Sequence, residues 1–223
     1  MSEVLKEFLI DFSVNVYETI AGFSLILGLF RFSFNKTYFI NTLIAAVVMA
    51  QTSYLLRFPL DLPFVTSFFM LVWIFLFLWR LFRIHPFYAS LMAVTGYMTY
   101  ITIQEFLLIF ASLFVGFEKI IGNFHLGKTL QVGSSSVSFL VYFLLSRKRI
   151  GFSFVPDKTE MKIKLDYIHR MLLMVTILSA FVICFTSFLA INFEFVMVII
   201  SATFMGVLIY LTYLNERSKT NTG

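Results

Sequence analysis

Long apolar runs recur along this chain, and their length limits the fold more than any other feature of the sequence. One of them, "TSFFMLVWIFLFLW" at 66–79, contains no charged residue. A helix of about 20 apolar residues spans a hydrocarbon layer of roughly 30 Å, because each residue adds about 1.5 Å. Backbone amides cannot stay unpaired in lipid, and the runs lack the alternation of barrel strands. Each long run therefore predicts a membrane-spanning helix.

The composition points to the same class of protein. Hydrophobic residues make up 60% and charged residues 13% of the 223 residues, and the mean hydropathy is +0.91. Soluble domains have a much more polar balance. The polar segments between the apolar runs are too short to fold alone. We therefore expect one all-α, polytopic membrane domain over residues 1–223, without a soluble domain, in the lipid bilayer of the cell membrane.

A window of about 19 residues predicts seven membrane-spanning helices. Prolines mark their limits, since Pro59 and Pro63 bracket the second loop and Pro86 opens the fourth span. The predicted spans lie near residues 8–30, 38–56, 64–82, 87–115, 130–146, 171–190 and 195–214.

The distribution of Lys and Arg predicts the orientation, because cytoplasmic loops hold the excess of basic residues. With seven spans, thirteen basic residues fall on one side and four on the other. This bias places the C-terminus in the cytoplasm and the N-terminus outside. The larger set is Arg31, Lys36, Arg80, Arg83, Arg147, Lys148, Arg149, Lys158, Lys162, Lys164, Arg170, Arg217 and Lys219, and the smaller set is Lys6, Arg57, Lys119 and Lys128.

The first span is the hardest to assign as a membrane crossing, because it carries Asp11 and Glu18. Its many apolar residues outweigh the insertion cost of an acidic residue, so we expect it to cross the membrane. An amphipathic helix on the inner surface is an open alternative. That alternative would give six spans with both ends inside.

Polar residues in the first span fall on one face of its helix. Asp11, Asn15, Glu18 and Gly22 step by four, three and four residues, which is the spacing of a single helical stripe. Exposure of such a stripe to lipid is unfavourable. We therefore expect it to face the inside of the bundle.

The fourth span adds a second intramembrane acid, Glu105, with Thr102 on the same broad side. We expect these residues and the stripe of the first span to line a polar cavity that is open to the outside. The alternative is structural: each acid is hydrogen-bonded to Ser or Thr, or paired with Arg57, and serves only helix packing.

Catalytic and metal-binding patterns are missing from the sequence. Cys184 is the only cysteine, and His169 lies about 20 Å away along the same predicted helix, too far to activate a thiol. His85 and His125 stand alone in opposite loops, so no ligand pair with metal spacing exists. The basic stretch 147–149 is assigned to lipid headgroups. We expect no enzyme activity, no cofactor, no metal and no nucleic-acid partner.

Three segments carry a family resemblance: "ETIAGFSLILGLFRFSFNK" at 18–36, "SYLLRFPLDLPF" at 53–64 and the Glu105 segment, which follows a strongly apolar third span. They resemble the sensory membrane region of bacterial peptide-pheromone histidine kinases of the accessory-gene-regulator type. The resemblance covers about residues 8–116. It implies a region of six or seven spans that receives an extracellular peptide and acts as a dimer. The matching positions are Glu18, Arg57, Pro59, Pro63 and Glu105.

The chain departs from that family at its end. The final residues, "NERSKTNTG", are not followed by a phosphoacceptor His or a nucleotide-binding domain, so we expect no kinase activity from this polypeptide. It is either a stand-alone relative of the sensor region or a fragment of a longer kinase.

The expected function is that of a non-enzymatic membrane sensor or receptor-like regulatory protein in a bacterial plasma membrane. Its ligand would be a peptide or a small amphipathic molecule bound from the outer face. A homodimer or a cytoplasmic or membrane signalling partner would transmit the signal. The alternative is a substrate-binding membrane component of a transporter. The candidate ligand-binding or intramembrane polar residues are Glu18, Glu105, Arg57, Asn15, Asp11 and Thr102.

Overall fold

The fold of the chain is seen in a computed structural model that describes residues 3–33, 35–62, 65–153, 155, 167–189 and 194–220. These residues form helices and no strand, which confirms the all-α prediction for this part of the chain. In chain order the helices are α1 (Glu3–Leu29), α2 (Lys36–Arg57), α3 (Thr66–Arg80), α4 (Pro86–Val115), α5 (Phe117–Gly122), α6 (Phe124–Lys148), α7 (Tyr167–Leu189) and α8 (Glu194–Thr220).

Four of the helices are long and apolar enough to cross a membrane. They occupy Leu5–Leu29, Lys36–Arg57, Pro86–Val115 and Phe124–Lys148. Apolar helical segments of fewer than 18 residues occupy Thr66–Arg80, Arg170–Ile183 and Ile199–Leu214. Every predicted span thus coincides with a helix, and crossing by α3, α7 and α8 stays a prediction.

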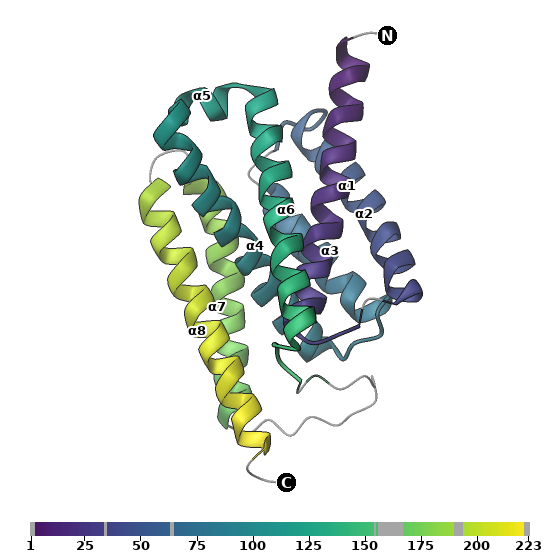
Figure 1. The fold of residues 1–223 in the computed structure, drawn as a ribbon, viewed down its shortest axis with the longest axis vertical. Helices are drawn as coiled ribbons and strands as arrows, with labels where there is room; N and C mark the ends of the chain where they lie inside the picture. The colour runs from purple at the N-terminus through teal and green to yellow at the C-terminus, as the bar shows by residue number, and fades with distance from the viewer. Residues whose placement is uncertain are drawn as a thin grey trace.

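Several boundaries differ from the predicted ones. Helix α6, for example, begins at Phe124, whereas the predicted span begins near residue 130. The third helix, α3, has only 15 residues and ends at Arg80, so it is shorter than the predicted span 64–82. The short helix α5 was not predicted, because its six residues carry no apolar run. Figure 1 shows α5 at one end of the bundle, between α4 and α6.

Side chains in the loops cap the first turn of two helices, and a proline opens a third. Asn35 accepts a hydrogen bond from the Tyr38 amide at 2.9 Å, and Asn123 accepts one from the His125 amide at 2.9 Å. These contacts satisfy amides that have no partner within the first helical turn. At the start of α4, Pro86 occupies a position where its missing N–H costs nothing.

Helix α4 lies at the centre of the bundle and packs against α1, α3, α6, α7 and α8. Figure 1 shows α1 and α6 side by side, with α2 and α3 beyond α1 and with α7 and α8 on the far side of α4. The Phe8 and Tyr54 rings, 4.6 Å apart between centroids, join the start of α1 to the end of α2. These two helices therefore run antiparallel.

Helices α1 and α6 run parallel and stay in contact over most of their length. Near the middle of both, the hydroxyls of Tyr17 and Ser136 lie 3.1 Å apart. At the other end, the Phe152 amide, just beyond α6, donates to the Leu29 carbonyl at 2.7 Å. A parallel pair of this kind places the polar face of α1 against the polar beginning of α6.

A small residue allows α4 to pack closely against α1. Gly96 on α4 lies directly against the Ile26 side chain on α1, so there is no room for a Cβ atom at that position. Both helices are buried there, since Ile26, Met92 and Ala93 belong to the apolar core. Close backbone approach at small residues is the usual packing of membrane helices.

Candidate functional site

Five polar side chains form a hydrogen-bonded network between α1 and α6. We call it the α1–α6 network, and it consists of Asp11, Asn15 and Glu18 on α1 and Lys128 and Gln131 on α6. The α1 members follow the helical stripe seen in the sequence, and Asp11 and Asn15 are buried. The stripe thus faces the inside of the bundle, toward α6.

An ion pair closes one end of the network. The Nζ atom of Lys128 lies 2.5 Å from Oδ1 of Asp11. Asn15 donates from Nδ2 to the other carboxylate oxygen, Oδ2, at 2.7 Å. The Asp11 side chain is only 2% exposed, so its charge depends on these two donors.

Gln131 joins the two helices at the centre of the network. Its Nε2 atom donates to Oδ1 of Asn15 at 2.9 Å and also to Oε2 of Glu18. Its Oε1 atom accepts from Nζ of Lys128 at 2.8 Å. Both amide hydrogens and the carbonyl are therefore in use, so the buried Gln131 side chain is fully satisfied.

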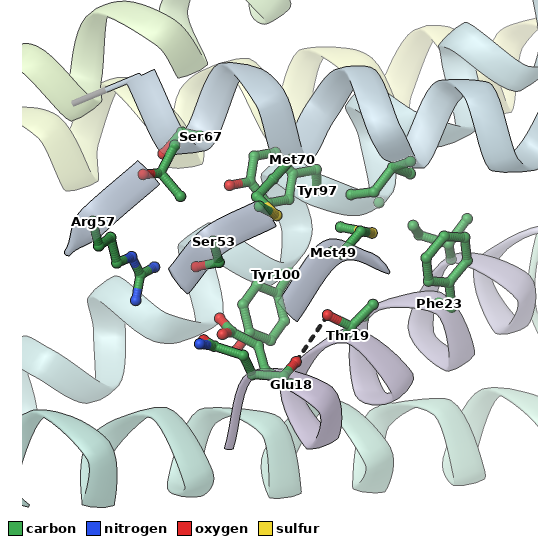
Figure 2. Close-up of a pocket in the computed structure, with 16 residues that line it drawn as sticks. Glu18, Thr19, Phe23, Met49, Ser53, Arg57, Ser67, Met70, Tyr97 and Tyr100 are labelled. Atoms are coloured by element: carbon green, nitrogen blue, oxygen red, sulfur yellow. Dashed lines mark hydrogen bonds between the residues drawn. The ribbon is translucent and has the colours of Figure 1, made fainter. Parts of the chain in front are cut away.

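A cavity of about 90 Å³ lies between α1, α2, α3 and α4, and we call it the four-helix cavity. It has room for several water molecules, since one water occupies about 10 to 15 Å³ of cavity volume. Figure 2 shows its lining. The lining residues are Asn15, Glu18, Thr19, Gly22, Phe23, Ile26, Met49, Ser53, Arg57, Thr66, Ser67, Met70, Ile74, Gly96, Tyr97 and Tyr100.

The two ends of the cavity differ in polarity. Arg57 is the last residue of α2 and Thr66 is the first residue of α3, so a basic and a hydroxyl side chain mark one end. In Figure 2, Phe23 lies at the opposite end, beyond Met49 and Met70. A molecule that fits both ends carries a polar group next to an apolar one.

Two groups of the lining have unmet capacity for contacts. Among the residues that the structure describes, Arg57 has no ion-pair partner, although it is half-buried. Within the described part of the chain, the buried hydroxyl of Thr66 also makes no hydrogen bond. Buried polar groups without partners are rare in folded proteins and are paired by water or by a ligand.

The cavity and the network share two residues, Asn15 and Glu18. A third connection runs through Tyr100 on α4, whose hydroxyl lies 3.3 Å from the hydroxyls of both Ser134 and Ser135 on α6. Tyr100 also lines the cavity. A molecule in the cavity can therefore act on α6 through Glu18 and through Tyr100.

Glu105 and Thr102 do not join this site, contrary to the expectation of one common cavity. Glu105 is outside the cavity lining, and Ser201 on α8 donates a hydrogen bond to its Oε2 atom. Thr102 is buried and donates to the Met98 carbonyl of its own helix at 2.9 Å. The suggested pairing of Glu105 with Arg57 is also not formed, because Arg57 has no ion-pair partner in the described parts of the chain.

Three residues at the site were not predicted from the sequence: Lys128, Gln131 and Tyr100. Lys128 was counted only as a basic residue at the edge of the fifth span. A signal was present, because Lys128, Gln131, Ser135 and Ser138 step by three, four and three residues and form one polar helical face. That face matches the stripe of α1 in length and position.

The other candidate positions are not among the described residues of the site. Pro59 lies in an exposed turn after α2, and Pro63 lies outside the described residues. The side chains of His169 and Cys184 are also outside the described part. Within the part that is described, no three His, Cys, Asp or Glu side chains lie close enough together to hold a metal ion.

In comparisons with protein families, curated proteins and solved structures, nothing matches this chain. We therefore infer the function from the geometry of the site.

Proposed function

We propose that this protein is a non-enzymatic membrane receptor whose four-helix cavity binds a small amphipathic molecule or one small group of a peptide. The observation that carries the proposal is the position of Glu18. Its side chain lines the cavity and accepts a hydrogen bond from Gln131 on α6. An occupant of the cavity that contacts Glu18 thereby changes the contact between α1 and α6.

The proposed topology has seven spans, with the N-terminus outside and the C-terminus in the cytoplasm. The bias of thirteen against four basic residues supports it. The packing of α1 supports it too, because Ala21, Leu25 and Leu27 are fully buried in the bundle. Parallel α1 and α6, with α2, α3 and α4 between them in the chain, fit alternate crossings of the membrane.

In this topology the cavity lies in the outer half of the membrane. Arg57, at its polar end, belongs to the smaller set of basic residues, on the outer side. The last turn of α6, which carries Arg147 and Lys148, is on the cytoplasmic side. A change at Gln131 therefore reaches the inner surface through one continuous helix.

The mechanism needs a network with two arrangements. In the first, Gln131 holds Glu18 and Asn15 together, as the structure has it. In the second, a ligand group takes over Glu18, and Gln131 keeps only Asn15 and Lys128. The ligand shifts the balance by its difference in affinity for the two arrangements.

The proposal is tested in the native host by removing the protein and restoring it. Cells are given conditioned medium, and both the transcriptional response and the uptake of labelled peptides are measured. A receptor restores the response and leaves uptake unchanged. A transporter component restores uptake, and restoration of neither contradicts both functions.

A cavity-filling variant connects that result to the site. An added Cβ atom at Gly22, which lines the cavity, meets nothing within 4 Å, so Gly22→Leu extends into the open space. We expect Gly22→Leu to abolish the response at normal membrane abundance. Gly206→Leu is the matched control, since Gly206 is exposed on α8, outside the cavity lining, and equally uncrowded.

A further inference from the structure

We infer that the four-helix cavity binds a small zwitterion with one apolar side chain, such as an apolar amino acid. The ligand carboxylate would contact Arg57 and Thr66, its ammonium would contact Glu18, and its side chain would lie among the apolar residues. This inference rests on the proposed function, because it names the class of ligand for the same cavity.

The charges that line the cavity favour a zwitterion. The lining contains one guanidinium, on Arg57, and one carboxylate, on Glu18, and no ion pair joins them. The neighbouring charges are already matched, because Lys128 pairs with Asp11. A ligand with only a negative charge would meet repulsion from Glu18, and one with only a positive charge would meet repulsion from Arg57. A zwitterion complements both groups at once.

The groups around these charges can form further hydrogen bonds with a ligand. The guanidinium of Arg57 presents a fork of donors that matches a carboxylate in a bidentate way. The unpartnered, buried hydroxyl of Thr66 lies in the same lining, at the same end of the cavity. Glu18 uses one oxygen for Gln131, and a carboxylate offers about four acceptor sites. Glu18 therefore retains capacity for an ammonium.

The volume and the lining of the four-helix cavity limit the size and polarity of the ligand. A cavity of about 90 Å³ is far below the roughly 300 to 1,000 Å³ of sites for drug-sized ligands, so it suits a single small group. The apolar part of its lining includes Phe23, Ile26, Met49, Met70 and Ile74. Methionine side chains adapt to different apolar shapes. One aliphatic side chain is the natural occupant of this end.

A lipid headgroup is the competing explanation for Arg57, because basic residues near the membrane surface contact lipid phosphates. For an anionic headgroup, that explanation gives no role to Glu18, and for any headgroup it needs no apolar cavity. The two explanations therefore differ in which parts of a probe molecule affect binding.

The experiment uses the full chain in phosphatidylcholine nanodiscs and four probes that differ by one group each. Leucine carries both charges and the side chain. 4-Methylpentanoate lacks only the ammonium, 3-methylbutylamine lacks only the carboxylate, and glycine lacks the side chain. Dissociation constants are measured by saturation-transfer NMR, with empty nanodiscs to correct for partition into lipid. We expect leucine to bind at least about tenfold more tightly than each other probe. For the two singly charged probes this is the effect of one charge-assisted hydrogen bond, and for glycine it is the loss of apolar burial.

Two variants test which side chain contacts each charge of the ligand. Arg57→Gln should remove the advantage of leucine over 3-methylbutylamine, and Glu18→Gln should remove its advantage over 4-methylpentanoate. Lys119→Gln is the matched control, because Lys119 is an exposed basic residue of α5 outside the cavity lining, and it should leave all four constants unchanged. Gly22→Leu should abolish leucine binding while both charges remain.

The inference is overturned if wild-type protein does not bind leucine, or if it binds the four probes alike. It is also overturned if leucine keeps its advantages in the two charge variants, or if Gly22→Leu still binds leucine, as a surface headgroup site would allow. If a charge variant does not fold, the wild-type probe series and the Gly22→Leu result still show whether the cavity binds a zwitterion.

The outcome is separate from that of the receptor proposal. One combined result is that the four probes bind in the expected order of affinity while the protein restores no response in the host. That result supports the ligand class and contradicts the receptor proposal. A response that Gly22→Leu abolishes, together with a flat leucine series, contradicts the ligand class alone.

Discussion

The ammonium of Lys128 lies 2.5 Å from the carboxylate of Asp11, and the two side chains are 11% and 2% exposed. The pair connects α6 to α1 at the end of the bundle where Phe8 of α1 meets Tyr54 of α2. Because both charges are buried, each is costly without the other. The ion pair therefore fixes the register of the parallel helices that carry the α1–α6 network.

Asp11→Asn should destabilise the protein by about 3 kcal/mol, because it leaves the Lys128 ammonium buried without a charged partner. Lys128→Gln should have a similar effect for the same reason. The free energy of unfolding of the double variant should fall by much less than the sum of the two single losses. The free energy of unfolding in mixed detergent measures all three, with the exposed Glu118→Gln as a control near zero. Strictly additive losses would show that the two side chains do not interact.

Gln131→Met should lower the free energy of unfolding by about 1 to 2 kcal/mol, because it removes three hydrogen bonds from a buried network. Ser136→Ala is the control on the same helix. Ser136 is exposed, and its hydroxyl contacts Tyr17 at 3.1 Å, so the loss should stay below about 0.5 kcal/mol. Equal losses in both variants would contradict a central role for Gln131.

Two alanine substitutions of glycine should have opposite effects on stability. Gly96→Ala forces a methyl group against the Ile26 side chain and should cost about 1 to 3 kcal/mol. Gly22→Ala adds a methyl group to open space in a helix and should stabilise by up to about 1 kcal/mol. Thermal unfolding in detergent separates them. A stable Gly96→Ala protein would mean that α1 and α4 do not pack as closely as described.

Accessibility of single cysteines to a membrane-impermeant maleimide should follow the proposed topology. In a Cys184→Ser background, a cysteine at Gly122 should react in intact cells, and one at Ile150 only after permeabilisation. A cysteine at Ser2 should react in intact cells if α1 crosses the membrane. Protection of Ser2 together with reaction at Gly122 would instead support six spans.

Much of the fold could be predicted because membrane helices are defined by local sequence. Apolar runs located α1, α2, α4 and α6, and capping residues such as Asn35 and Pro86 agree with their boundaries. The six residues of α5 were missed because a short helix at a membrane surface is not marked by hydropathy.

The site was harder to predict, because helical periodicity tells which residues share a face of one helix and not which helix lies opposite. Asp11, Asn15 and Glu18 were grouped correctly on that basis. Glu105 was placed with them, whereas its carboxylate faces Ser201 on α8. Gln131 was passed over because its partners lie on α1, far away in the sequence.

The central claim is that the carboxylate of Glu18 acts in ligand binding and that the carboxylate of Glu105 serves packing. The most direct test compares Glu18→Gln with Glu105→Gln in host cells, at matched membrane abundance, by the dose of conditioned medium needed for half of the maximal response. Gln can still accept the hydrogen bond of Ser201, so Glu105→Gln should leave this dose within about twofold of wild type. Glu18→Gln should raise it at least about tenfold, since a charged contact in the cavity is lost. An unchanged dose for Glu18→Gln, or equal shifts for both variants, would contradict the account.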